Sequence, residues 1–256
     1  MLKTLVKKQM QEIFRSYFYD EKKNKKRSTA STVMYILLYV LIMVGVLGGM
    51  FTFLSVAICG AFTAAGMGWL YFALMGLLAI LLGTFGSVFN TYASLYLSKD
   101  NDLLFSLPIP VRYIMISRLT SVYLMGLMYS AVVILPADIV YWVTMPFSVG
   151  TLVGPILLTF LISVFVLVLS CLLGWVIAKI SQKLKHKSFI TVIVSLAFFG
   201  AYYFFYFRAQ EMIQDLVQNV MVYGENIKGS AYPIYLFGAA GTGEPLAMLV
   251  LTAVVA

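Results

Sequence analysis

Apolar residues fall in long, nearly uninterrupted runs along this chain, and short polar stretches separate the runs. Five of them are long enough to cross a bilayer, because a spanning helix needs about 20 predominantly apolar residues. These runs cover residues 32–58, 68–97, 114–145, 151–179 and 189–207. The pattern predicts an all-α membrane protein, a polytopic transmembrane helix bundle with five complete spans.

A sixth apolar run begins at Pro245 and stops at Ala256, the last residue of the sequence. A helix of that length rises about 18 Å, which is short of a hydrocarbon core about 30 Å thick. We therefore expect a truncated sixth span. Residues 1–256 would form a single transmembrane domain, the N-terminal half of a longer polypeptide.

The segment before the first span has the pattern of an amphipathic helix. Its apolar residues recur at helical spacing, and the charged ones lie elsewhere. The apolar set is Leu2, Leu5, Val6, Ile13, Phe14 and Tyr17. This pattern predicts an N-terminal helix over residues 2–18 that lies in the membrane interface. A soluble amphipathic helix that packs on a partner is the alternative.

Composition agrees with a membrane bundle. The chain is 62% hydrophobic and only 11% charged, with a mean hydropathy of +0.95, whereas a soluble domain carries about 25% charged residues. Cys59 and Cys171 both lie inside apolar runs, so nothing supports a disulfide framework. The first run is also too long for the core of a cleaved signal peptide, so we expect it to be retained as a span.

Basic residues are distributed unevenly between the predicted connections. Nine of the 18 Lys and Arg lie in residues 1–28, three lie in 98–118 and four in 179–187, whereas 208–244 has two and the connections 59–67 and 146–150 have none. Because cytoplasmic connections are enriched in Lys and Arg, the N-terminus is predicted to be cytoplasmic. The chain is expected in the cell membrane, with its N-terminal charge on lipid headgroups, and no nucleic-acid partner is expected.

Small residues recur four positions apart in and beside three of the predicted spans. The pairs are Gly45 with Gly49, Ala79 with Gly83, and Gly150 with Gly154. Such spacing lets two helix backbones approach closely, so each pair is a candidate contact face.

The cytoplasmic connection at 98–112 has the features of a short amphipathic helix. Ser98 or Asp100 can cap its start, where the helix dipole also favours negative charge. Three leucines then form an apolar face, and Pro108 and Pro110 end the helix. The alternative is an ordinary capped turn that lies on the headgroups.

This segment resembles a known family. Ser-Lys-Asp-Asn-Asp-Leu-Leu-Phe-Ser-Leu-Pro-Ile over residues 98–109, followed by Arg-Tyr-Ile-Met-Ile-Ser-Arg over 112–118, is similar to permeases of type-2 ATP-binding-cassette (ABC) exporters of Gram-positive bacteria. The order of elements along the whole chain is similar too. The motif-level resemblance is confined to residues 97–118.

The resemblance implies that this chain is a membrane-spanning permease subunit. In such permeases a coupling helix docks on a separate ATPase subunit, and two membrane halves or copies pair. The residues implied as the ATPase contact are Lys99, Asp100, Asp102, Leu103, Leu104, Leu107 and Pro108.

The outer connection at 208–244 also has helical periodicity. Its apolar residues are Met212, Ile213, Leu216, Val217 and Val220. They predict an amphipathic segment at the outer leaflet. Gly238, Gly241 and Gly243 then predict a flexible stretch before Pro245. The stretch has no Gly-Lys-Ser/Thr ending, so it is not a phosphate-binding loop.

The motifs of common enzymes do not occur in the sequence. No G-x-x-x-x-G-K-[ST] is present, so ATP hydrolysis is expected on another subunit. His186 is the only histidine, which cannot supply a two-histidine metal site. We therefore expect this chain to be no enzyme and to hold no cofactor or metal.

Asp138 is the one acid inside a predicted span, two residues after Pro136. Acids in spans are costly and often mark pathways, and a proline can free a backbone carbonyl or kink the helix. Both residues are therefore candidates for an export pathway or gate. An outer-interface position for Asp138 is the alternative. Two other functions stay open: an ion-coupled secondary transporter that uses Asp138, and a non-transport scaffold or sensor.

Overall fold

The computed structural model describes residues 2–20, 25–96, 106, 109–183, 200, 208 and 211–255. In this part of the chain four helices are long and apolar enough to cross a membrane: Thr29–Ala64, Gly68–Tyr96, Val111–Thr144 and Val149–Ile180. They confirm the predicted all-α bundle and the first four predicted spans. The predicted span at 189–207 lies outside the described residues.

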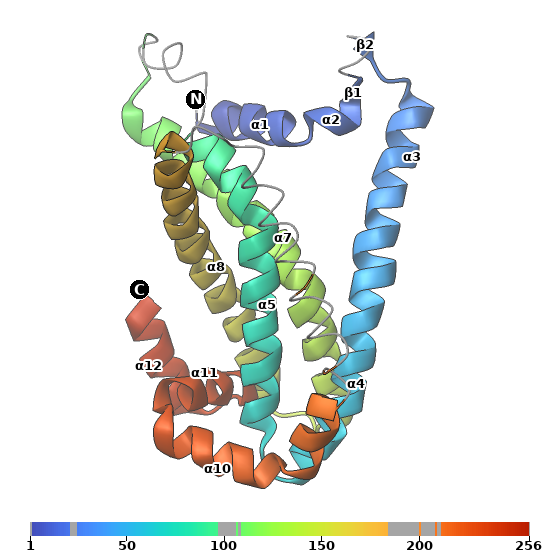
Figure 1. Ribbon diagram of the computed structural model, residues 1–256, viewed down its shortest axis with the longest axis vertical. Helices are drawn as coiled ribbons and strands as arrows, with labels where there is room; N and C mark the ends of the chain where they lie inside the picture. The colour runs from blue at the N-terminus through green and yellow to red at the C-terminus, as the bar shows by residue number, and fades with distance from the viewer. Residues whose placement is uncertain are drawn as a thin grey trace.

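The first span is one continuous helical rod that stands partly away from the others. It consists of α3 (Thr29–Val40), the π-helical stretch η1 (Leu41–Gly48) and α4 (Gly49–Ala64). Ser28 caps its start by accepting a hydrogen bond from the backbone N–H of Ser31. No side chain of α3 is buried, and Figure 1 shows α3 separated from the remaining spans at the end where α1 lies. α4 brings the rod back into contact with α5 and α7.

The centre of the bundle is α5 (Gly68–Thr91), which continues as the π-helical η2 (Tyr92–Tyr96). It packs between α7 (Val111–Thr144) and α8 (Val149–Lys183). Gly83 of α5 and Gly126 of α7 face the same side chain, since a methyl group on either would come within 2.9 Å of Val166. The predicted contact face at Ala79 and Gly83 is thus confirmed.

At Gly45 and Gly49 the structure shows no such face. A methyl group at Gly49 would meet no atom within 4 Å, and one at Gly45 would meet only its own helix, at Leu41. Spacing alone does not distinguish these glycines from Gly83, because the partner helix is needed to make the contact.

The N-terminal segment is helical, as predicted. α1 (Leu2–Ile13) and α2 (Arg15–Phe18) lie across one end of the bundle (Figure 1). α1 packs on α7, and Gln9 donates a hydrogen bond to the Ser94 hydroxyl at 3.2 Å. The short antiparallel strands β1 (Tyr19–Asp20) and β2 (Lys25–Lys26) then lead into α3.

The connection at 208–244, whose outer position stays a prediction, is described at residues 208 and 211–244. Residues 211–218 are helical, and α10 (Val220–Ser230) follows. Ile213 and Val217 pack against the core and Val220 is buried, although Met212 is exposed. The phenol of Tyr223 donates to Asp215 at 2.6 Å, and this hydrogen bond raises the pKa of Tyr223.

The glycines that follow do not form the predicted flexible stretch. Gly238 and Gly241 lie buried within α11 (Tyr232–Thr242), because the absence of side chains lets this helix approach α5. A methyl group at Gly238 would collide with the carbonyl oxygen of Trp69, and one at Gly241 would lie 2.8 Å from Leu158. The expectation of flexibility was therefore wrong at these two positions.

α11 ends at Gly243, whose φ of 89° requires the left-handed region that favours glycine. α12 (Pro245–Val255) then leaves at an angle of 114° to α11. The run that begins at Pro245 is thus one arm of a bent helix pair, which has the form of a broken span or a re-entrant loop. Gly150 and Gly154 of α8 contact this bend, which confirms them as a contact face.

Candidate functional site

Asp138 lies inside the bundle, on the face of α7 that meets α8. Only 2% of the residue is exposed. Its Oδ2 accepts a hydrogen bond from the Thr159 hydroxyl at 2.9 Å, whereas its buried Oδ1 has no hydrogen-bond partner among the described residues. Because buried polar atoms are nearly always bonded, this oxygen distinguishes Asp138 from the other acids that the structure describes.

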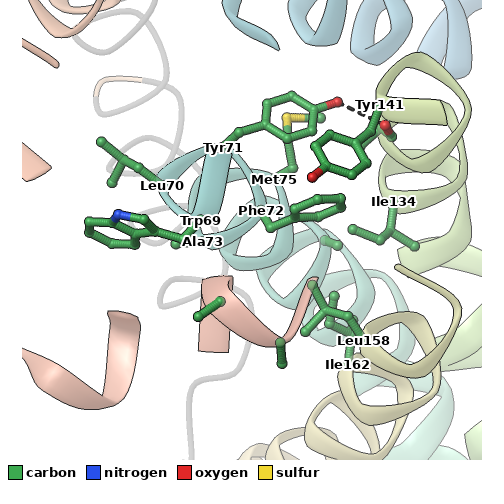
Figure 2. Close-up of a cluster of buried hydrophobic side chains, with 14 of the residues drawn as sticks. Trp69, Leu70, Tyr71, Phe72, Ala73, Met75, Ile134, Tyr141, Leu158 and Ile162 are labelled. Atoms are coloured by element: carbon green, nitrogen blue, oxygen red, sulfur yellow. Dashed lines mark hydrogen bonds between the residues drawn. The ribbon is translucent and has the colours of Figure 1, made fainter. Parts of the chain in front are cut away.

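A second polar contact lies one residue away along α7. The Tyr71 hydroxyl donates to the Ala137 carbonyl at 2.9 Å. Since a phenol has one proton to give, the Ser55 hydroxyl, 2.8 Å away, donates to Tyr71. The ring of Tyr71 stacks on that of Tyr141, with centroids 6.2 Å apart, and Figure 2 shows the two tyrosines side by side within the apolar core.

These contacts bring four helices together at one level of the bundle. Ser55 comes from α4, Tyr71 from α5, Asp138 from α7 and Thr159 from α8. Sequence reasoning identified only Asp138, because hydroxyl residues in apolar runs carry no periodic signal that reveals their partners. The cluster can hold or release a proton at the carboxylate, and it can lock the four helices in one arrangement.

The structure separates Pro136 from this cluster. α7 stays helical through Pro136, and the proline lines an apolar groove of about 650 Å³ between α7 and the first span. Asp138 does not line that groove. The two predicted pathway residues therefore face different surroundings, and a pathway or gate role for either stays a prediction.

The depth of Asp138 also matters to its role. Along α7 it lies 20 residues beyond Arg118, which is a rise of about 30 Å at 1.5 Å per residue. That rise equals the thickness of a hydrocarbon core. Arg118 itself is buried in the bundle. The interfacial alternative for Asp138 thus stays open, although its side chain points into protein and away from lipid.

A further proline, Pro155 of α8, has a partner arrangement that the sequence did not reveal. Proline has no N–H, so the carbonyl four residues earlier, that of Thr151, loses its helical donor. The indole Nε1–H of Trp142 in α7 supplies one at 2.8 Å. This contact ties the last turn of α7 to the first turn of α8.

The predicted ATPase-contact residues lie outside the described residues: Lys99, Asp100, Asp102, Leu103, Leu104, Leu107 and Pro108. Of that connection the structure describes Ser106, which is exposed, and Ile109 and Pro110, which lead into α7. Beyond it, Ile114 and Ser117 of the family-like motif are buried on α7.

Among the described residues no group of three or more His, Cys, Asp or Glu side chains could hold a metal ion. The cluster around Asp138 and Tyr71 consists of hydroxyl, carboxylate and backbone groups. Comparisons with protein-family models, with curated proteins and with solved structures found no match to this chain.

Proposed function

We propose that this chain is the permease subunit, or its N-terminal half, of an ATP-driven ABC exporter of the type-2 class. One observation carries the proposal. The helices on either side of the family-like segment 97–118 meet it at the end of the bundle where α1 lies: η2 ends there at Tyr96, α7 begins there at Val111, and α8 also ends there (Figure 1). An ATPase bound at this end would contact the connection between two spans directly.

Charge supports the orientation of this end toward the cytoplasm of the cell. The connections rich in Lys and Arg are 1–28, 98–118 and 179–187, and the described elements next to them, α1, α2, β2, the start of α7 and the end of α8, lie at this end (Figure 1). Lys179 lies over the ring of Trp175 at 3.9 Å, an aromatic and cationic pair typical of a membrane boundary. We place the protein in the plasma membrane with a cytoplasmic N-terminus.

In this function ATP is hydrolysed on the partner subunit, and the permease converts ATPase closure into a rearrangement of its spans. Leu103, Leu104 and Leu107 would enter a groove of the ATPase, with Asp100 and Asp102 at its edge. Pro108 would make the connection stiff enough to transmit force. A second permease half or copy would complete the pathway for the exported substrate.

The test is co-purification of the tagged full-length protein from native membranes in mild detergent, followed by mass spectrometry. A stoichiometric ATPase with a phosphate-binding loop is expected. The triple variant Leu103→Asp, Leu104→Asp, Leu107→Asp should insert normally but lose the ATPase. Its control carries Met at the same positions, which conserves volume and apolarity and should keep it. Reproducible absence of any ATPase from the wild-type preparation would refute the proposal.

A second candidate, an ion-coupled secondary transporter, is favoured by the buried Oδ1 of Asp138. The Asp138→Asn variant separates the two functions. Asn keeps an acceptor for Thr159 but cannot carry a proton. Reconstituted proton-coupled flux would be abolished in the secondary transporter, whereas ATP-driven export would continue in the ABC exporter.

A further inference from the structure

An apolar groove runs along the first span on the side that faces α7. Its larger part, about 650 Å³, is lined by residues that include Tyr39, Met43, Gly49, Met128, Ala131 and Pro136. A smaller part of about 320 Å³ is lined by Phe14, Phe18, Ile36, Tyr39 and Val40. Tyr39 and Val40 line both parts, so the two parts adjoin along the first span.

The lining offers almost nothing to a polar ligand. The Thr52 hydroxyl donates to the Gly48 carbonyl of its own helix at 2.8 Å, and the Tyr39 hydroxyl reaches the Sδ of Met128 at 3.7 Å. The remaining lining residues are apolar or are glycines, which have no side chain. A hydrocarbon chain is therefore the ligand class that fits, since it asks for no hydrogen bonds.

Basic residues adjoin the lining of the smaller part. The backbone N–H of Arg27 donates to the Phe18 carbonyl at 3.0 Å, so Arg27 is next to a residue that lines this part. Its guanidinium lies 4.3 Å from the ring centroid of Tyr35, one turn before Tyr39. Arg15 follows Phe14 directly and stacks over Tyr19. Lys25 and Lys26 are exposed next to Arg27.

We propose that this groove binds one anionic phospholipid. An acyl chain would lie between the first span and α7, and the phosphate would lie at Arg15 and Arg27. Charge complementarity selects this occupant. A second copy seated in this groove would bring its own basic N-terminal segment to Arg15 and Arg27, which like-charge repulsion disfavours, so a second copy is expected to pair through another face.

The proposal does not rest on the exporter function, because it concerns only the N-terminal helices, the first span and α7. It holds equally for a transporter without an ATPase. Lipid binding in the groove is therefore expected whether or not an ATPase subunit is present.

The test is native mass spectrometry of the purified full-length protein, mixed with phosphatidylglycerol or phosphatidylcholine of matched chains. The wild type is expected to retain one phosphatidylglycerol, with a preference of about tenfold over phosphatidylcholine. Gly49→Leu fills the groove, since the space before Gly49 is open, and should lose this lipid. Gly60→Leu is the matched control, because Gly60 is equally open but lies on α4 outside the groove.

Two double variants that each remove two positive charges test the role of Arg15 and Arg27. Arg15→Gln with Arg27→Gln should reduce this preference for phosphatidylglycerol at least fivefold, to about twofold or less. Lys3→Gln with Lys7→Gln removes the same charge from exposed positions of α1 and should leave the preference unchanged. If Gly49→Leu fails to fold, Ala131→Leu fills the same groove from α7.

Two results would overturn the proposal. One is equal lipid retention by Gly49→Leu and Gly60→Leu. The other is a wild-type dimer that Gly49→Leu dissociates without any change in bound lipid, which would make the groove an interface between copies.

Discussion

The hydroxyl of Tyr71 joins three helices at one point. It donates to Ala137 of α7 and accepts from Ser55 of α4, while its ring packs against Phe72 and Tyr141. In a bundle surrounded by lipid the hydrophobic effect does not drive helices together, so such contacts and close packing decide which faces meet.

Removal of that hydroxyl should therefore be measurable. Tyr71→Phe keeps the ring but leaves the Ser55 hydroxyl without its acceptor. We expect the free energy of unfolding in detergent to fall by about 0.5–1.5 kcal/mol, measured by thermal melting. Tyr113→Phe, at an exposed position of α7, is the control and should change little. An unchanged melt for Tyr71→Phe would show that the contact does not stabilise the bundle.

Close approach at Gly238 gives a second residue-level prediction. A methyl group there meets the backbone of Trp69, which cannot move without displacing α5. Gly238→Ala is expected to cost about 1–3 kcal/mol, the usual range for overpacking. Gly229→Ala, where a methyl group meets nothing within 4 Å, should be neutral or stabilise α10 by up to about 1 kcal/mol. Similar thermal shifts in both variants would contradict the packing of α11 on α5.

At the level of elements, the turn between α7 and α8 contains a hydrogen bond in which a side chain of α7 donates to a backbone carbonyl of α8 that has no helical donor. Trp142 supplies the hydrogen bond that Pro155 cannot make to Thr151. This pairing has a thermodynamic consequence that a double-mutant cycle can measure.

Trp142→Phe should destabilise the wild-type protein by about 1 kcal/mol beyond its loss of packing. In a Pro155→Ala background the Ala N–H can bond to the Thr151 carbonyl, so the same substitution should cost less. Chemical denaturation of the four proteins gives the coupling free energy, expected at about 0.5–1.5 kcal/mol. A coupling of zero would mean that the indole bond is not a substitute for the missing helical one.

At the level of the whole molecule, the helices divide its polar segments between two ends. α1, α2 and β2 lie at one end and α10 at the other (Figure 1). Gly224 of α10 packs against Met67, in the turn between α4 and α5, which ties α10 to that second end. If the N-terminus is cytoplasmic, α10 faces the outside of the cell.

Labelling with a membrane-impermeant maleimide tests that orientation. In a background with Cys59 and Cys171 replaced by Ala, Glu225→Cys on α10 should react in intact cells. Lys26→Cys on β2 should react only after the membrane is permeabilised, because it lies at the basic end. The reverse pattern would invert the topology and remove the cytoplasmic site proposed for an ATPase.

The sequence determined the positions of the described spans closely. The predicted spans 68–97, 114–145 and 151–179 compare with Gly68–Tyr96, Val111–Thr144 and Val149–Ile180, because in lipid each span must satisfy its own backbone and be apolar over its length. The first span proved longer than predicted, running on to Ala64. Those requirements act within each span, so the sequence alone predicts where the spans lie.

Only the tertiary structure decided which faces meet. It showed that Gly238 and Gly241 pack inside a helix, that Gly49 faces open space, and that Asp138 pairs with Thr159. Each of these depends on how two helices cross, and helical spacing reports only the surface of one helix. The sequence therefore predicted where the spans lie, while the positions of side chains between helices decided the site.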